Sequence, residues 1–128
     1  MFNNCIKSSH ATGVDLPSGQ IRDKVTGLIW QTTSQATGNW SSALTNAVGQ
    51  SGNGWRLPNI KELMSVVDTG CESPAWNSSV FGDTVGVYWT SSYDINNPNN
   101  TWAVDFSSGE LISIAQATEN VKSLLVKN

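Results

Sequence analysis

Apolar positions first recur at helical spacing between residues 40 and 48. The spacing is i, i+3, i+4, i+7 and i+8, which predicts that these side chains share one face of a helix. The members are Trp40, Ala43, Leu44, Ala47 and Val48. Asn39 is suited to the N-cap of this helix and Gly49 to its end.

A second helical repeat follows between residues 60 and 67, where the apolar residues are Ile60, Leu63, Met64 and Val67. Asn59 and Glu62 form an N-cap and N3 pair similar to a capping box. Arg56 precedes this helix, and we expect its donors to be used by backbone carbonyls and a carboxylate, Glu62 or Asp105. A structural role predicts that Arg56→Ala unfolds the domain. The alternative is that Arg56 binds an anionic ligand.

Extended segments surround the two helices. Residues 20–22 and 28–31 predict a hairpin whose turn uses Gly27. A long loop is expected at 69–86, and four further strands are expected at 87–91, 102–106, 111–114 and 121–126. In the segment 102–107 apolar and polar residues alternate, which predicts one apolar and one polar face. Residues 107–109 then form a hairpin turn.

This order of elements predicts an α+β fold, because strands and helices do not alternate as in parallel βαβ units. Residues 1–18 lack hydrophobic periodicity and are expected to form an irregular arm, whereas 19–128 are expected to form a single domain. The chain has six tryptophans but only 13% charged residues, so it has enough aromatic surface to fold. Most of these tryptophans are expected in the core: Trp30, Trp40, Trp55, Trp89 and Trp102.

The charge of the chain limits its partners. Its formal net charge is -3 and its few basic residues are dispersed, which argues against binding nucleic acid or an anionic membrane surface. No apolar stretch is long enough for a spanning helix, so no membrane insertion is expected. Cys5 and Cys71 form no metal motif. They are either a disulfide or two free thiols.

Candidate binding residues lie in the loops. The segment from Tyr93 to Asn100 holds one carboxylate and four carboxamides, groups suited to neutral sugars or peptide backbone. The expected ligand-binding residues are Trp76, Tyr93, Asp94, Asn96, Asn97, Asn99 and Asn100. Oxygen-rich loops can hold Ca²⁺, but turns have the same composition, and we expect no metal or cofactor.

Catalysis has little support in the sequence. His10 is the only histidine and lies in the irregular arm, where a solvated side chain is more common than a general base. Asp94 and Asp105 are the only carboxylates that could face a groove as a hydrolase pair. We therefore expect a protein that is not an enzyme, with a hydrolase as the remaining alternative.

Four motifs in order resemble one known family. They are Gly19–Gln31 (GQIRDKVTGLIWQ), Gly54–Leu63 (GWRLPNIKEL), Tyr88–Ser92 (YWTSS) and Trp102–Gly109 (WAVDFSSG). Together they resemble the Legionella collagen-like protein C-terminal domain family, over roughly Gly19 to Val126. The resemblance implies a bacterial module with a C-type lectin-like fold of two helices, short antiparallel sheets and long loops.

The resemblance also implies an exported protein, secreted, periplasmic or on the cell surface, that acts in adhesion, including binding to polyanionic glycans. The net charge of -3 favours an uncharged ligand instead. We expect a recognition domain that binds a glycan or a protein through surface loops. The alternative is a structural module of a larger surface assembly, including a homo-oligomer.

Overall fold

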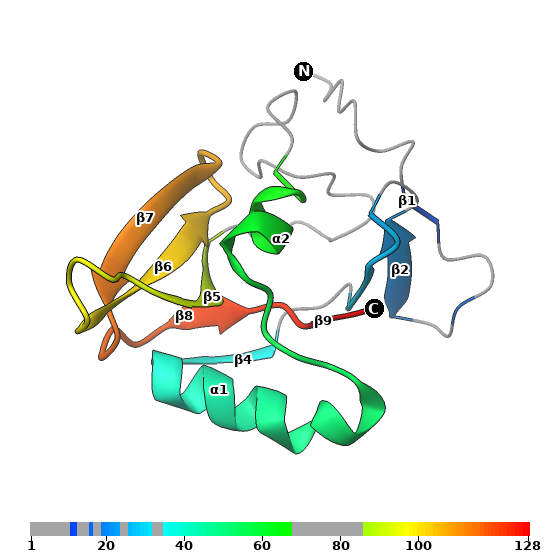
Figure 1. Cartoon of the computed structure of the whole chain (residues 1–128), viewed down its shortest axis with the longest axis horizontal. Helices are drawn as coiled ribbons and strands as arrows, with labels where there is room; N and C mark the ends of the chain where they lie inside the picture. The colour runs from blue at the N-terminus through cyan, green and yellow to red at the C-terminus, as the bar shows by residue number, and fades with distance from the viewer. Residues whose placement is uncertain (1–10, 13–15, 17–18, 24–25, 32–34, 68–85) are drawn as a thin grey trace.

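The computed structural model describes residues 11–12, 16, 19–23, 26–31, 35–67 and 86–128. Within them the fold is α+β, with two α-helices and two sheets (Figure 1). In chain order the elements are β1 (Ala11–Thr12), β2 (Gln20–Asp23), β3 (Ile29–Gln31), β4 (Gln35–Gly38), α1 (Trp40–Gly49), the 3-10 helix η2 (Ser51–Asn53), α2 (Ile60–Met64), β5 (Val87–Tyr93), β6 (Asn100–Asp105), β7 (Glu110–Ala115), β8 (Val121–Ser123) and β9 (Val126–Lys127).

The two sheets share the C-terminal segment of the chain. The four-stranded sheet has the order β1-β2-β3-β9, and the five-stranded sheet has the order β4-β8-β5-β6-β7. The single strand expected at 121–126 is therefore wrong, because Leu124 and Leu125 separate β8 from β9 and carry the chain from one sheet to the other. β5 and β8 pair in parallel, so the larger sheet is mixed and not purely antiparallel as expected.

Two apolar clusters cover opposite faces of the five-stranded sheet, because consecutive residues of a strand point to opposite faces. Tyr88 and Val104 belong to the cluster that contains Leu63 of α2. Their neighbours Trp89 and Ala103 belong to the cluster that contains residues of α1. In Figure 1, α1 and α2 accordingly lie on either side of β5 and β8. The chain thus builds its core from both faces of one sheet.

This two-sided core corrects the prediction of a polar face on the segment 102–107. Ala103 is fully buried although it was assigned to that face. Trp102 is only partly buried and belongs to neither cluster, so the expectation that it is a core residue is wrong. Its cross-strand neighbour is Ser113, and Asn100 lies two positions before it on the same face. The apolar cluster therefore ends before Trp102, where the sheet becomes polar.

Helix α1 agrees with its prediction at both ends and departs from it at Val48. The Asn39 side chain accepts a hydrogen bond from Ser42 N (2.9 Å), as expected of the N-cap. The helix ends at Gly49 as expected, and the C-cap residue Gln50 follows it, with its N–H donating to Ala47 O (3.1 Å). Val48 is 71% exposed because eight residues rotate a helix about 80° beyond two full turns. It therefore lies at the margin of the apolar stripe.

Helix α2 has the predicted capping box of Asn59 and Glu62 but ends at Met64, earlier than expected. Val66 and Val67 are still buried, in the turn that follows. The hairpin over residues 20–31 is confirmed, with Gly27 at φ 78°. The hairpin turn at 107–109 is also confirmed, because it connects the antiparallel β6 and β7.

Two short strands were not expected from the sequence. β1 lies in the segment 1–18 expected to be irregular, where it pairs with β2, and β4 pairs with β8. Both are short and gain their hydrogen bonds from a neighbouring strand, which local sequence patterns do not encode. Cys5, Cys71, Trp76 and most of the loop expected at 69–86 lie outside the described residues.

Candidate functional site

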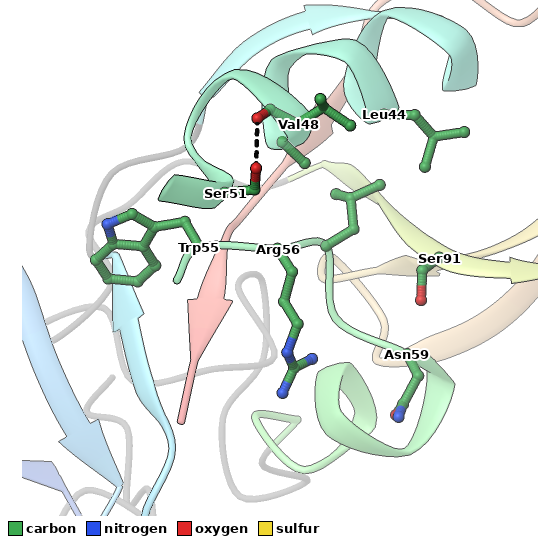
Figure 2. A pocket seen from close by; sticks show the side chains of 9 residues that line it. Leu44, Val48, Ser51, Trp55, Arg56, Asn59 and Ser91 are labelled. Atoms are coloured by element: carbon green, nitrogen blue, oxygen red, sulfur yellow. Dashed lines mark hydrogen bonds between the residues drawn. The ribbon is translucent and has the colours of Figure 1, made fainter. Parts of the chain in front are cut away.

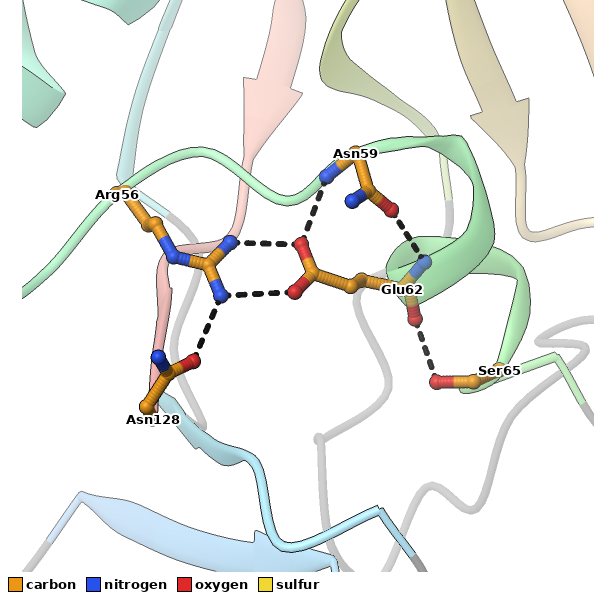
Figure 3. A network of polar contacts seen from close by, with 5 residues as sticks. All are labelled: Arg56, Asn59, Glu62, Ser65 and Asn128. Carbon is orange, nitrogen blue, oxygen red and sulfur yellow. Dashed lines mark hydrogen bonds and ion pairs between the residues drawn. The ribbon is translucent and has the colours of Figure 1, made fainter.

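Arg56 and Glu62 form a polar corner at the start of α2 (Figure 3). Arg56 Nη1 donates to Glu62 Oε1 and Arg56 Nη2 donates to Glu62 Oε2, both at 2.7 Å. Glu62 Oε1 also accepts from Asn59 N (3.0 Å), and Asn59 Oδ1 accepts from Glu62 N (2.8 Å). Arg56 Nη2 reaches Asn128 Oδ1 as well (3.0 Å). We call this set of four residues the Arg56 corner.

The electrostatics of the Arg56 corner follow from this two-pronged contact. The hydrogen bond from Arg56 lowers the pKa of the Glu62 carboxyl below its ordinary value, and the bond from Asn59 N lowers it further, against the opposing effect of burial. The same contact raises the pKa of Arg56. The guanidinium thus already binds Glu62 and Asn128 of the same chain, which favours the structural role over anion binding. Asp105 is not its carboxylate, because Asp105 Oδ1 accepts from Ser107 N (2.9 Å) in the β6–β7 turn.

The tryptophans mostly hold the scaffold together. Trp30, Trp55 and Trp89 are buried, and Trp89 Nε1 donates to Gly38 O (3.0 Å). Trp40 is partly buried, and its Nε1 donates to Thr90 O (2.9 Å), which joins α1 to β5. The indole N–H groups of Trp40 and Trp89 therefore fix elements to one another.

An open groove of about 360 Å³ lies between α1 and the segment 55–59 (Figure 2). Its lining is mainly apolar, with polar groups at the margin: Leu44, Ala47, Val48, Ser51, Trp55, Arg56, Leu57, Asn59 and Ser91. Figure 2 shows Leu44 and Val48 projecting from α1, whereas the guanidinium of Arg56 points away from them. We call this cavity the α1 groove. Its size falls within the range of small binding clefts.

The loop at residues 93–100 is organised by the carboxylate of Asp94. Asp94 is only 8% exposed. Its Oδ1 accepts from Asn96 N (3.0 Å) and its Oδ2 from Ser113 Oγ (2.7 Å). Ser113 Oγ in turn accepts from Asn100 Nδ2 (3.2 Å). Asp94 and Asn100, two of the expected ligand-binding residues, are thus used to hold the loop against β7.

The other expected ligand-binding residues of this loop face outward. Tyr93 is 53% exposed, and the side chains of Asn96, Asn97 and Asn99 are exposed as well. Ile95 is 77% exposed. Sequence reasoning did not select Ile95, although a single apolar residue among Asp and Asn was a signal for it. The loop therefore presents two apolar side chains among amides.

The 93–100 loop and the α1 groove are neighbours along strand β5. Ser91 lines the groove and is two residues before Tyr93, a separation of about 7 Å in a strand. The large hydrophobic side chains exposed in the described part of the chain are Val48, Tyr93 and Ile95. Val48 lines the groove, whereas Tyr93 and Ile95 belong to the 93–100 loop. Val48 had been assigned to the buried helix face, and only its position at the margin of the stripe hinted at exposure.

The described residues bring together no cluster of three or more His, Cys, Asp or Glu side chains that could hold a metal ion. Asp94 N donates to Asn100 O (2.9 Å) at the start of the six-residue strand β6, and Asp105 is the last residue of that strand, which places the two aspartates about 17 Å apart. Carboxylate pairs of glycosidases are separated by less than about 10 Å. These two residues therefore do not form the pair that the hydrolase alternative requires.

Comparison with known proteins identifies the family. In the described part of the chain, no helix has the length and apolar character needed to cross a membrane. No curated protein matches the chain. The family model of the Lcl C-terminal domain matches residues 19–127, a span that includes the α1 groove, the 93–100 loop and all of the Arg56 corner except Asn128. The chain therefore belongs to the Lcl C-terminal domain family.

Proposed function

We propose that this domain is an exported recognition module, secreted, periplasmic or on the cell surface, that binds a protein or a glycan and is not an enzyme. Its two helices and two sheets are compatible with the C-type lectin-like scaffold implied by the family resemblance. The ligand surface consists of the α1 groove and the 93–100 loop. The observation that carries the proposal is that Val48 in the groove and Tyr93 and Ile95 in the loop are the large hydrophobic side chains exposed in the described residues.

The chemistry of this surface favours an uncharged ligand. Arg56 is the charged residue that lines the groove, and its guanidinium is bound to Glu62. When a ligand covers exposed apolar side chains, binding is stabilised by about 25 cal/mol per Å² of apolar surface buried. The amides of Asn96, Asn97 and Asn99 supply donors and acceptors for a peptide backbone or for sugar hydroxyls.

A protein ligand fits this surface better than a neutral glycan. An apolar groove accepts aliphatic side chains, and Leu44, Val48 and Leu57 provide the lining for them. A glycan would use stacking on an exposed aromatic ring, which Tyr93 offers at the loop. We therefore favour a protein segment with apolar side chains, and a neutral glycan is the second candidate.

A charge placed in the groove tests the proposal. The domain is screened against extracellular protein and glycan arrays, and the binders found are measured with Val48→Glu and Ser42→Glu. Ser42 is exposed on the same helix but is not part of the groove, so it controls for the added charge. We expect Val48→Glu to weaken binding at least tenfold and Ser42→Glu to leave it within twofold. Equal affinities of the two variants, or no binder at micromolar concentration, would contradict the proposal.

A structural role in a larger surface assembly is the second candidate function. It is favoured by strand β7, which lies at the edge of the five-stranded sheet.

A further inference from the structure

Strand β7 forms an outer edge of the five-stranded sheet. In Figure 1 it lies beside β6, on the side of the sheet away from β4 and β8. Its ladder with β6 is continuous over all six residues, from Glu110 to Ala115. By contrast, β4 at the opposite edge has an irregular register. β7 is therefore the regular, unpaired edge of the described sheet.

The backbone groups that β7 leaves unpaired can be assigned from its register. Gln116 N donates to Asn99 O (2.9 Å), next to the pair of Ala115 and Asn100. Hydrogen-bonded and non-hydrogen-bonded pairs alternate along an antiparallel ladder. The even-numbered residues of β7 therefore direct their N–H and C=O groups toward β6. The odd-numbered residues direct theirs outward: Leu111, Ser113 and Ala115. Among these groups, the C=O of Ala115 already accepts from Thr118 N (3.0 Å).

The side chains of β7 are incompletely covered on both faces of the sheet. Leu111 packs against the cluster beside α2, whereas Ile112 and Ile114 pack against the cluster beside α1. All three are only partly buried. A further strand at this edge would extend both clusters at once, since it would add side chains on both faces.

Unpaired edges are usually protected by charges, proline or a bulge. The segment 111–118 contains no charged residue and no proline, and its pairing with β6 has no bulge. The edge thus lacks the features that prevent strands from pairing. The one charged residue of β7 is Glu110 at its first position, so a copy of the same edge meets no like charge along the segment 111–118.

We propose that β7 pairs antiparallel with β7 of a second copy of this chain, which joins the two sheets across a two-fold axis at Ser113. Leu111 then lies opposite Ala115 of the second copy, and the outward backbone groups of both strands become paired. The two Glu110 side chains are placed about 20 Å apart, beyond the screening length of about 8 Å at physiological salt. This inference is independent of the proposed recognition function.

The expected dimer is weak. One strand pair covers less than the roughly 1,200–2,000 Å² of a standard stable interface, so we expect dissociation in the range of about 10–100 µM. Sedimentation velocity across a concentration series measures it. The mass should rise from the 13.8 kDa of one chain toward twice that value at several hundred micromolar.

Two substitutions at one residue test the register. Ala115 is exposed and its N–H points outward, so Ala115→Pro removes a donor of the new pairing without removing a bond to β6. Ala115→Glu buries a carboxylate against Leu111 of the second copy. Ala117→Glu is the matched control, because Ala117 is also exposed but lies beyond β7. We expect both Ala115 variants to be monomers and Ala117→Glu to dimerise like the native chain.

Amide hydrogen exchange tests the same pairing without a variant. On concentration, protection should increase at Leu111, Ser113 and Ala115 and stay constant at Ile112 and Ile114. A monomer at all concentrations, a trimer, a dimer that survives both Ala115 substitutions, or exchange at the outward amides that does not change with concentration would each overturn the proposal.

Discussion

The Arg56 corner and the 93–100 loop use the same device for different purposes. In each, one carboxylate accepts a backbone N–H close to it in sequence: Glu62 accepts from Asn59, and Asp94 accepts from Asn96. In the corner the second carboxylate oxygen of Glu62 accepts from Arg56, so the two charged groups pair with each other. In the loop the second oxygen binds Ser113 of β7, and no side chain of the loop tip is used.

The motif that is easiest to recognise in the sequence is therefore not the one whose side chains are exposed to a ligand. The segment Trp55–Asn59 is conspicuous in the sequence because Trp, Arg and Pro stand together, but the structure employs it to join α2 to β9 through Arg56 and Val126. The 93–100 loop looks like an ordinary turn, yet its buried Asp94 allows Tyr93 and Ile95 to remain exposed. The surface suited to a ligand is therefore the less conspicuous one.

The largest effect on stability is expected from Glu62→Ala. This substitution removes both the contact with Arg56 and the capping bond from Asn59 N. We expect a loss of about 2–3 kcal/mol in the free energy of unfolding, measured by urea denaturation. Arg56→Ala keeps the cap, and the Arg56 side chain is 41% exposed. We therefore expect it to lower the free energy of unfolding by about 1–2 kcal/mol and not to unfold the domain completely, as the sequence alone had predicted.

Glu110→Ala provides the control for Glu62→Ala. Glu110 is an exposed carboxylate at the end of β7, and its loss should change stability by less than about 0.5 kcal/mol. If Glu62→Ala and Glu110→Ala had the same free energy of unfolding, the ion pair of the corner would contribute no measurable stability. The corner would then not differ from the loop as a stabilising contact.

Asp94→Ala should have the next largest effect. It leaves Asn96 N and Ser113 Oγ without their acceptor in a partly buried position, which costs about 1–2 kcal/mol. It should also weaken ligand binding, because the loop loses its attachment to β7. Asp94→Asn is the matched variant: its amide oxygen can still accept from Asn96 N, so it should retain more stability than Asp94→Ala. Equal losses in the two variants would show that the shape of the loop does not depend on this acceptor.

The sequence predicted the local parts of this contrast and not the long-range parts. The capping box was predictable because Asn59 and Glu62 are three residues apart and their contact is local. The bond between Asp94 and Ser113 joins residues 19 positions apart, and only the pairing of β6 with β7 brings them together. The same holds for β4, and for Trp102, whose burial depends on which neighbours the sheet supplies.

The pH dependence of stability tests the ion pair of the corner, with a smaller expected effect than the Ala substitutions. The pKa of Glu62 is lowered in the folded state from its ordinary value of 4.5. Its contribution is therefore fully present above about pH 4.5 and is lost as the pH falls through the lower folded value. Glu62→Gln keeps a group that can cap α2 but removes the charge. We expect the native chain to be the more stable above pH 4.5 and the difference to narrow toward pH 3; a difference that stays constant with pH would contradict the ion pair.

The smallest effect on stability is expected from the double substitution Tyr93→Ser and Ile95→Ser. Both side chains are more than half exposed, at 53% and 77%, so their removal should change the free energy of unfolding by less than about 0.5 kcal/mol. Binding of the ligand found in the screen should nevertheless fall at least tenfold, because these side chains are the apolar part of the loop surface. Asn97→Ala, at another exposed position of the loop, is the control and should alter both quantities little. A clear loss of stability in the double variant would mean that Tyr93 and Ile95 stabilise the fold, as Arg56 and Glu62 do in the corner. The ligand surface would then be the α1 groove alone.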